Sequence, residues 1–191
     1  MKTIVMDFPA QLESERLLLR SPRPGDGPVI NAALRESWPE LKTWMIWAAA
    51  EPPAVYESEA WAREGYARFV TRRDLPLLVF LKDGKTLVGS SGLHRIDWSV
   101  PRFEIGYWLH TAYTGRGYMT EAVATMTRFA FDTLGARRVE IRMDARNTRS
   151  AAVPQRLGFV HEGTLKHWRR HHLTNELVDV MVFAQTRPDT L

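Results

Sequence analysis

The hydrophobic pattern alternates between short apolar runs and longer amphipathic stretches along the whole chain. Short apolar runs bounded by turn residues predict strands, and apolar residues recurring at helical intervals predict helices. The predicted strands span residues 16–20, 77–81, 86–93, 103–110, 138–143, 160–167 and 177–184. The predicted helices span residues 28–36, 56–72 and 119–134, with a further short helix after residue 143. Six or seven strands interspersed with helices, several of them joined by hairpins, indicate one mixed sheet in an α/β or α+β domain.

Turn and capping residues mark several of the predicted boundaries. Asp83 and Gly84 connect two strands with the Asp-Gly pair that favours a tight hairpin. Asp26 is a candidate N-cap for the first helix, because a short carboxylate can accept the unpaired N–H groups of a helix start. Gly135 is the predicted C-cap of the helix that precedes it. Local chemistry therefore supports the alternation that periodicity suggests.

A glycine turn stands between a predicted strand and a predicted helix in the segment YTGRGYMTEAVA, residues 113–124. The N-terminus of a helix has unpaired N–H groups and a positive dipole end, and Gly115 and Gly117 would let a ligand approach that backbone closely. The unit suits a phosphate or diphosphate, to which Arg116 would add a positive charge. A P-loop motif is absent, and Thr120 stands where a dinucleotide fingerprint requires glycine. A plain tight loop is therefore an equal alternative at this point.

Composition narrows the class of protein. The 191 residues include 26 Lys and Arg against 22 Asp and Glu, a formal net charge of +4, which favours an anionic ligand and argues against nucleic acid as a partner. The chain has no cysteine, which excludes disulfides, thiol nucleophiles and cysteine metal sites. Asp7 interrupts the short apolar run at the N-terminus, and no stretch is long enough to cross a bilayer, so we expect neither a signal peptide nor a membrane partner. We expect one cytoplasmic domain over residues 1–191.

Two long segments resemble a known family. FEIGYWLHTAYTGRGYMTEA, residues 103–122, and RVEIRMDARNTRSAAVPQRLGFVHEG, residues 138–163, are similar to the GCN5-related N-acetyltransferase (GNAT) superfamily. The opening SERLLLR and the late LVDVMVFA match its ribosomal-protein-alanine N-acetyltransferase (RimJ/RimL-like) branch, so the likeness covers nearly the whole chain. The resemblance implies a GNAT-type mixed, mostly antiparallel sheet flanked by helices, with a V-shaped splay between two central parallel strands. Those strands would be residues 103–110 and 138–143.

The resemblance also implies an acetyl-CoA site. Backbone N–H groups of the glycine turn would hold the pyrophosphate, and the pantetheine arm would run along the strand end at residues 107–110. Asn147 matches a family asparagine that bonds this arm, and Ser150 matches a serine near the thiol sulfur. For Tyr118 and Thr120 the alternative is a role in starting and packing the helix. The residues assigned to the cofactor are Trp108, Leu109, His110, Gly115, Arg116, Gly117, Tyr118, Met119, Thr120, Asn147 and Ser150.

Acetyl transfer requires a base for the amine, an N–H donor for the developing oxyanion and a proton for the leaving thiolate. Glu104 is the candidate base, since the family often places a carboxylate on this strand; a solvated or ion-paired glutamate is the alternative. The N–H near Leu109 is the oxyanion donor that the resemblance implies. Pro154 replaces the tyrosine acid of many members and should bend the helix, which leaves Ser150 as the candidate acid. Helix N-capping is the alternative role of Ser150.

The acceptor is less defined. Trp44 and Trp47 are the candidate acceptor-binding residues, because they lie where this family builds its acceptor pocket; core packing is the alternative. His167, His171 and His172 predict a basic rim near the mouth of the site, and we expect no metal. We therefore expect transfer of acetyl from acetyl-CoA to a primary amine, either a protein N-terminal Ala or Ser or a small molecule, by direct attack. The alternative is a non-catalytic CoA-binding module with the same fold, and the family allows a homodimer.

Overall fold

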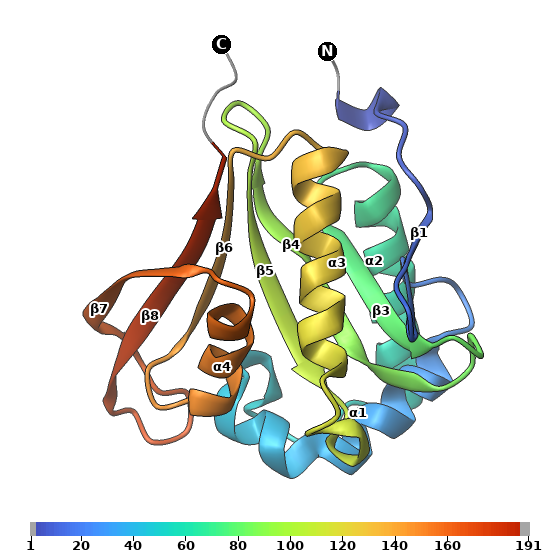
Figure 1. Cartoon of the computed structure of the whole chain (residues 1–191). Coiled ribbons are helices and arrows are strands. Elements are labelled where there is room, and N and C mark those ends of the chain that lie inside the picture. The colour runs from blue at the N-terminus through green and yellow to red at the C-terminus, as the bar shows by residue number, and fades with distance from the viewer. Residues whose placement is uncertain (1–2, 188–191) are drawn as a thin grey trace.

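The computed structural model describes residues 3–187. Its strands are β1 (Gln11–Glu13), β2 (Leu17–Arg20), β3 (Leu75–Leu81), β4 (Leu87–Asp97), β5 (Arg102–Leu109), β6 (Arg138–Asp144), β7 (Val160–Arg170) and β8 (Leu177–Thr186). Within the described residues they form one eight-stranded sheet in the order β1-β2-β3-β4-β5-β6-β8-β7 (Figure 1). Neighbouring strands are antiparallel except for β5 and β6, which are parallel.

Helices cover both faces of the sheet. They are α1 (Gly27–Trp44), α2 (Val55–Val70), α3 (Tyr118–Asp132) and α4 (Thr148–Arg156), with short 3-10 turns η1 (Thr3–Val5), η2 (Ile46–Ala48) and η3 (Thr111–Tyr113). In Figure 1, α3 crosses the near face of the sheet with α4 beside it, whereas α2 lies behind the sheet. The two faces therefore present different surroundings to the strands between them.

Strand β3 shows how the sequence fills two cores at once. Leu77 and Val79 point to the face that carries α3, whereas Leu78 and Phe80 point to the face that carries α1 and α2. Successive side chains of a strand alternate between faces, so a strand covered on both sides must be apolar at nearly every position. This explains the continuous run LPLLVFL, which is buried from Leu75 to Phe80.

The two central strands separate along their length. The parallel register of β5 and β6 runs from the pair Arg102 and Arg138 to the pair Glu104 and Glu140, and there it ends. Strand β5 continues to Leu109 and β6 to Asp144, and Figure 1 shows α4 in front of the region where they diverge. The expected V-shaped splay between two central parallel strands is confirmed.

All seven predicted strands are present, with shifted boundaries, but the predicted total of six or seven strands is wrong. The additional strand is β1, which pairs with β2 at the edge of the sheet. Its three residues, Gln-Leu-Glu, are too few and too polar for a period-two pattern to reveal. The first helix is also much longer than the predicted residues 28–36, since it continues through Pro39 to Trp44.

The capping chemistry predicted for Asp26 is wrong, although Asp26 does occupy the N-cap position of α1. Its carboxylate accepts two hydrogen bonds from the Arg20 guanidinium, at 2.7 and 2.8 Å, and one from the Arg23 N–H. Glu59 of α2 accepts the Gly27 N–H at 3.0 Å instead. The start of α1 is therefore capped by a side chain from α2 and not by its own N-cap residue.

Among residues 3–187, none of the helices combines the length and apolar character that crossing a membrane requires.

Candidate active site

The glycine turn between η3 and α3 is exposed and has the conformation that only glycine adopts easily. Gly115 and Gly117 have φ angles of +75° and +78°, in the left-handed region. Gly117 is the N-cap of α3, and no side chain in the described chain caps this helix start. A Cβ built on Gly115 would meet no described atom within 4 Å. The turn thus offers open space beside uncapped N–H groups, which fits the geometry of a phosphate or diphosphate site.

The first turn of α3 is held by packing. Met119 is buried in the core between α3 and the sheet, and Tyr118 and Thr120 are half-buried. The Tyr118 ring centre lies 4.7 Å from the Arg16 guanidinium carbon and 6.4 Å from the Tyr113 ring centre. These contacts fix the direction in which α3 begins. The polar groups that point outward from this end of the helix are its backbone N–H groups.

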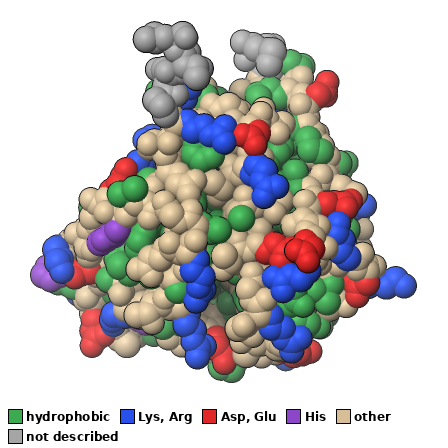
Figure 2. All heavy atoms as spheres, viewed as in Figure 1, with side chains coloured by type: hydrophobic (Ala, Val, Ile, Leu, Met, Phe, Trp, Pro, Cys, Tyr) green, Lys and Arg blue, Asp and Glu red, His purple; other side chains and the backbone are tan. Residues whose placement is uncertain are grey.

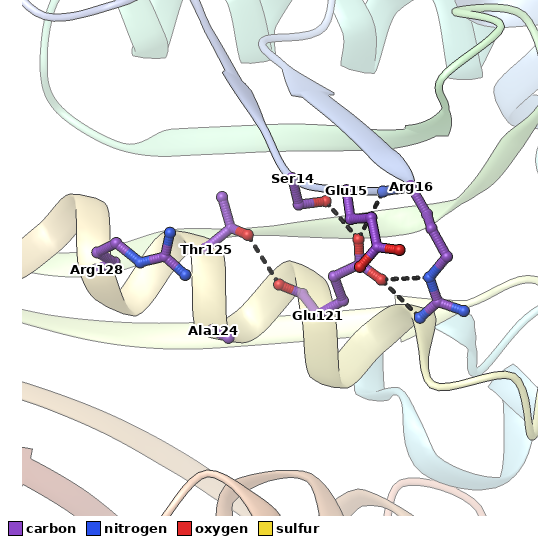
Figure 3. Close-up of a pocket in the computed structure, with 7 residues that line it drawn as sticks. All are labelled: Ser14, Glu15, Arg16, Glu121, Ala124, Thr125 and Arg128. Atoms are coloured by element: carbon purple, nitrogen blue, oxygen red, sulfur yellow. Dashed lines mark hydrogen bonds and ion pairs between the residues drawn. The ribbon is translucent and has the colours of Figure 1, made fainter.

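Arg16 and Glu121 brace the turn from the side of β2, beside a surface pocket of about 460 Å³ (Figure 3). Glu121 accepts hydrogen bonds from Ser14 Oγ at 2.7 Å, from the Arg16 backbone N–H at 2.8 Å and from Arg16 Nε at 2.6 Å. Burial raises the pKa of Glu121, but these hydrogen bonds and the Arg16 charge together lower it by more, so the pKa lies below its ordinary value. Arg16 Nη1 also donates to the carbonyl oxygen of Arg116, at 3.0 Å. The Glu121 carboxylate therefore fixes the Arg16 side chain, which in turn binds the glycine turn through the Arg116 carbonyl oxygen.

Positive charge gathers at this end of the molecule. Figure 2 shows several Lys and Arg side chains on the lower part of the face that carries α3 and α4. Arg16 and Arg116 flank the turn, and Arg149 in the first turn of α4 is exposed. Arg16 is paired with Glu121, so the exposed Arg116 and Arg149 are the charges that add to the preference of an open helix N-terminus for an anionic ligand.

The side chains at the end of β5 are occupied by packing. Leu109 packs against the core under α3, whereas Trp108 packs against the core under α1 and α2. His110 is buried, and its Nε2 lies 2.9 Å from Glu36 Oε2 on α1. These three residues therefore fix the strand end between the helices, and their backbone is what faces the splay.

The backbone N–H of Leu109 points toward β6. The next N–H, that of His110, donates to the Val88 carbonyl oxygen on the β4 side at 2.9 Å. Successive N–H groups of a strand point to opposite edges, so the Leu109 N–H is directed to the other edge of β5. The ladder with β6 has ended five residues earlier, at Glu104. The Leu109 donor therefore faces the splay.

A hydrogen-bonded pair joins β5 to α4 across the splay. Tyr107 Oη donates to the Ser150 carbonyl oxygen at 2.8 Å, and Ser150 Oγ donates to Tyr107 Oη at 3.1 Å. Burial raises the pKa of Tyr107 to about 12, so its hydroxyl is protonated at neutral pH. Asn147 is the N-cap of α4, and its Oδ1 accepts the Ser150 N–H at 3.0 Å. N-capping by Ser150, the alternative drawn from the sequence, is therefore wrong.

Sequence reasoning did not select Tyr107, although the signal was available. Strand alternation places it on the same face as Phe103 and Ile105, which are buried under the front helices. A tyrosine at a buried strand position usually finds a hydrogen-bond partner for its hydroxyl. The sequence does identify the partner, Ser150, as a site residue. Its position beside Tyr107 depends on the path of the chain after β6, which no local pattern predicts.

Glu104 lies on the other face of the sheet, at the point where β5 and β6 separate. Its Oε2 is 3.5 Å from Arg95 Nε and 3.6 Å from Arg142 Nε, and no described atom makes a hydrogen bond to it. Burial raises the pKa of Glu104 above its ordinary value, and the two arginines oppose that rise. A half-buried carboxylate with a raised pKa and a buried oxygen that accepts no hydrogen bond is suited to accept a proton. The nearby arginines also keep the ion-paired alternative open.

The tryptophans of the acceptor region differ in exposure. Trp47 in η2 is 54% exposed, and its ring centre lies 6.0 Å from that of the buried Trp38. Trp44 is half-buried at the end of α1. Core packing, the alternative drawn from the sequence, is wrong for Trp47, because more than half of this residue is exposed.

The histidines near the β7–β8 connection contact the end of α1. His171 Nε2 lies 3.2 Å from the Thr43 carbonyl oxygen, and His172 Nε2 lies 2.8 Å from the Lys42 carbonyl oxygen. His171 is buried, so its predicted place in a basic rim is wrong; it and the half-buried His172 contact the last carbonyl groups of α1, whereas His167 is exposed. Across residues 3–187, no group of three or more His, Cys, Asp or Glu side chains is placed to hold a metal ion.

Comparison with known proteins is consistent with this geometry. Residues 16–160 match the family model described as "Acetyltransferase (GNAT) domain". The ribosomal-protein-serine acetyltransferase of Escherichia coli (strain K12) is 27% identical over 146 residues, which are 75% of this chain and 80% of that protein.

Solved structures show the same fold. RimL, a ribosomal L7/L12 alpha-N-protein acetyltransferase in complex with coenzyme A, has a TM-score of 0.82 and 22% identity, covering 92% of this chain and 97% of its own. The microcin C7 self-immunity acetyltransferase MccE, in complex with acetyl-CoA and AMP, has a TM-score of 0.83 and 20% identity, covering 91% of this chain and 94% of its own. With a family model that matches three quarters of its residues, the chain belongs to the GNAT acetyltransferase family, in the branch similar to the ribosomal-protein N-acetyltransferases.

Proposed function

We propose that this protein transfers the acetyl group of acetyl-CoA to the α-amino group of a protein N-terminus that begins with Ala or Ser, by direct attack in a ternary complex. The acetyl thioester of acetyl-CoA supplies the activated carbonyl carbon. We further propose that the chain acts in the cytoplasm as one domain over residues 1–191. The observation that carries the proposal is the half-buried Glu104 carboxylate at the point where β5 and β6 part, whose buried Oε2 accepts no hydrogen bond within the described chain.

The described residues fit acetyl-CoA at three places. The uncapped N–H groups at Gly117 and the start of α3 suit the diphosphate, and Arg116 adds charge beside them. Leu109 offers its backbone N–H to the splay, where an extended acyl arm would find a main-chain partner. Asn147 uses only its Oδ1 to cap α4, so its side-chain NH2 group is available to donate to the extended acyl arm.

Each step of the transfer has a candidate residue. Glu104 accepts a proton from the incoming ammonium group, directly or through water, so that the free amine can attack the carbonyl carbon. The Leu109 N–H donates to the carbonyl oxygen as negative charge develops on it. Ser150 lies across the splay on α4 and is the candidate donor to the departing sulfur, toward which its hydroxyl turns from Tyr107 Oη, the atom to which it donates in the structure. Trp108 and Met119 contribute packing that keeps these backbones in place.

The names of two similar proteins, a ribosomal-protein-serine acetyltransferase and a ribosomal L7/L12 alpha-N-protein acetyltransferase, support a protein N-terminus as the acceptor. Exposed Trp47 and half-buried Trp44 offer an apolar surface on which the first residues of such a peptide would pack. A small-molecule amine is the second candidate, because MccE, which is described in complex with acetyl-CoA and AMP, has a similar fold. A homodimer, which the family allows, would be seen by sedimentation in solution.

The test is acetyl-CoA consumption with peptides that begin with Ala or Ser, with the same peptides blocked at the α-amino group, and with small amines such as polyamines. Mass spectrometry should locate the acetyl group on the free α-amino nitrogen. Glu104→Gln should lower turnover by roughly 10²-fold or more with little change in acetyl-CoA affinity. Glu13→Gln, an exposed carboxylate on β1, is the matched control. Tight acetyl-CoA binding without transfer to any acceptor would instead support a non-catalytic binding module.

A further inference from the structure

Pro154 changes the hydrogen bonding of α4 at one identifiable atom. It lies inside the helix, four residues after Ser150. In an α-helix the N–H of residue i+4 donates to the carbonyl oxygen of residue i, and proline has no N–H to donate. The Ser150 carbonyl oxygen is therefore deprived of its ordinary helical donor, and an unpaired buried carbonyl is costly.

The donor that reaches this oxygen comes from the sheet. Tyr107 Oη lies 2.8 Å from the Ser150 carbonyl oxygen, across the region where β5 and β6 no longer pair. A tyrosine hydroxyl has one proton, so this bond commits the proton to the carbonyl and leaves the oxygen lone pairs as acceptors. Ser150 Oγ, at 3.1 Å, donates to that oxygen. The two residues are thus joined by a reciprocal pair of hydrogen bonds.

The start of α4 is fixed on its other side by Asn147, whose side chain accepts the Ser150 N–H. The N–H, the carbonyl oxygen and the hydroxyl of Ser150 each have a defined partner, and two of these three bonds go to Tyr107. The direction of the serine side chain therefore depends on the strand as much as on the helix.

We propose that Tyr107 is a positioning residue: through the carbonyl oxygen that Pro154 leaves without a helical donor, it ties α4 to β5 and fixes the position of Ser150 Oγ at the splay. The catalytic consequence rests on the proposed function, because it assumes that the Ser150 hydroxyl rotates about a fixed Oγ, leaves Tyr107 Oη and donates its proton to the leaving sulfur. The structural part, a coupling between residues 107 and 154 through Ser150, does not depend on that assumption.

A double-mutant cycle tests the structural part. Pro154→Ala returns an N–H to the helix, which can then donate to the Ser150 carbonyl oxygen in the usual way. Tyr107→Phe keeps the ring and removes only the hydroxyl. We expect Tyr107→Phe to lower Tm in the wild-type background by at least twice as much as in the Pro154→Ala background, because the carbonyl then has another donor. Equal shifts in the two backgrounds would overturn the proposal.

Kinetics test the functional part. We expect Tyr107→Phe to lower kcat about tenfold with KM for acetyl-CoA within about twofold. Pro154→Ala should also lower kcat while keeping or raising Tm, since alanine favours a helix interior. A merely structural role would move kcat and Tm together. The kcat losses should not add in the double variant, and unchanged kcat in Tyr107→Phe would overturn the functional part.

Two further variants serve as controls. Pro39→Ala relieves a proline inside α1, and Tyr66→Phe removes a hydroxyl from a 43% exposed ring on α2. Neither should change kcat by more than about twofold or show coupling in Tm. If the wild-type protein acetylates none of the acceptors offered, the proposed function fails, yet the Tm cycle still decides whether Tyr107 and Pro154 are coupled.

Discussion

Arg16 and Arg116 are joined by a hydrogen bond of 3.0 Å from the guanidinium of the first to the backbone carbonyl of the second, although they lie 100 positions apart in the chain. The bond connects the beginning of β2 to the glycine turn before α3. It makes the shape of a candidate diphosphate site dependent on a strand from the opposite end of the sequence.

Arg16→Ala should therefore weaken CoA binding. Loss of the bond frees the Arg116 carbonyl and loosens the turn, while Glu121 loses its cationic partner. Because the Arg16 side chain is 44% exposed, we expect only about a three- to tenfold rise in Kd, measured by isothermal titration calorimetry. Lys82→Ala breaks the exposed ion pair with Glu13 and is the matched control, which should bind CoA normally. Unchanged affinity in Arg16→Ala would show that the turn holds its shape without this brace.

Gly117→Val should abolish detectable CoA binding for two reasons. A side chain is strained at the φ angle of +78°, and its Cβ would lie 3.5 Å from Arg16 Nη2, beside the open N–H groups. Gly135→Val is the matched control, because Gly135 also has a positive φ, +68°, with no described atom within 4 Å of a built Cβ. Both variants should lose stability, but only Gly117→Val should lose binding in a titration at a temperature where both are folded. Full affinity in Gly117→Val would place the ligand elsewhere.

The parts of this protein that sequence could predict are those fixed by local chemistry. Gly115 and Gly117 have the positive φ angles that a short turn before a helix requires, and the strand alternation of β3 follows from its apolar run. The family resemblance added the splay, which no local pattern contains. Strand β1 escaped because three residues carry no periodic signal.

The parts that could not be predicted are those in which distant residues compete for the same group. Local rules put Asp26 at the right position, but Arg20 took its carboxylate and Glu59 of α2 took over the cap. The contact between Tyr107 and Ser150 spans 43 positions and depends on a proline whose effect appears only when the strand is beside the helix. A propensity describes a residue and its neighbours in sequence. Which partner a polar group binds is decided instead by its neighbours in space.

The pH dependence of acetyl transfer should report on Glu104. Burial raises its pKa above the usual value of 4.5, so the proton is held to a higher pH and the carboxylate forms only above that. Since only the carboxylate accepts a proton, kcat/KM should rise with pH through an acidic limb that lies above pH 4.5. Glu104→Gln should lose this limb and retain the limb that belongs to the acceptor amine. A profile identical in shape to that of the wild-type protein would leave Glu104 as an ion-paired residue of the sheet.

Acceptor binding should depend on Trp47 while cofactor binding does not. The Trp47 ring is tilted by 59° against the buried Trp38 at a centroid distance of 6.0 Å and is 54% exposed, so it is anchored on one side and more than half accessible to an acceptor. Trp47→Ala removes that apolar surface, and we expect KM for a peptide acceptor to rise about fivefold or more with KM for acetyl-CoA unchanged. Tyr56→Ala, at a 74% exposed ring on α2, is the control and should leave both constants within about twofold. If both substrates lost affinity equally, Trp47 would be supporting the fold, and the acceptor surface would have to lie elsewhere.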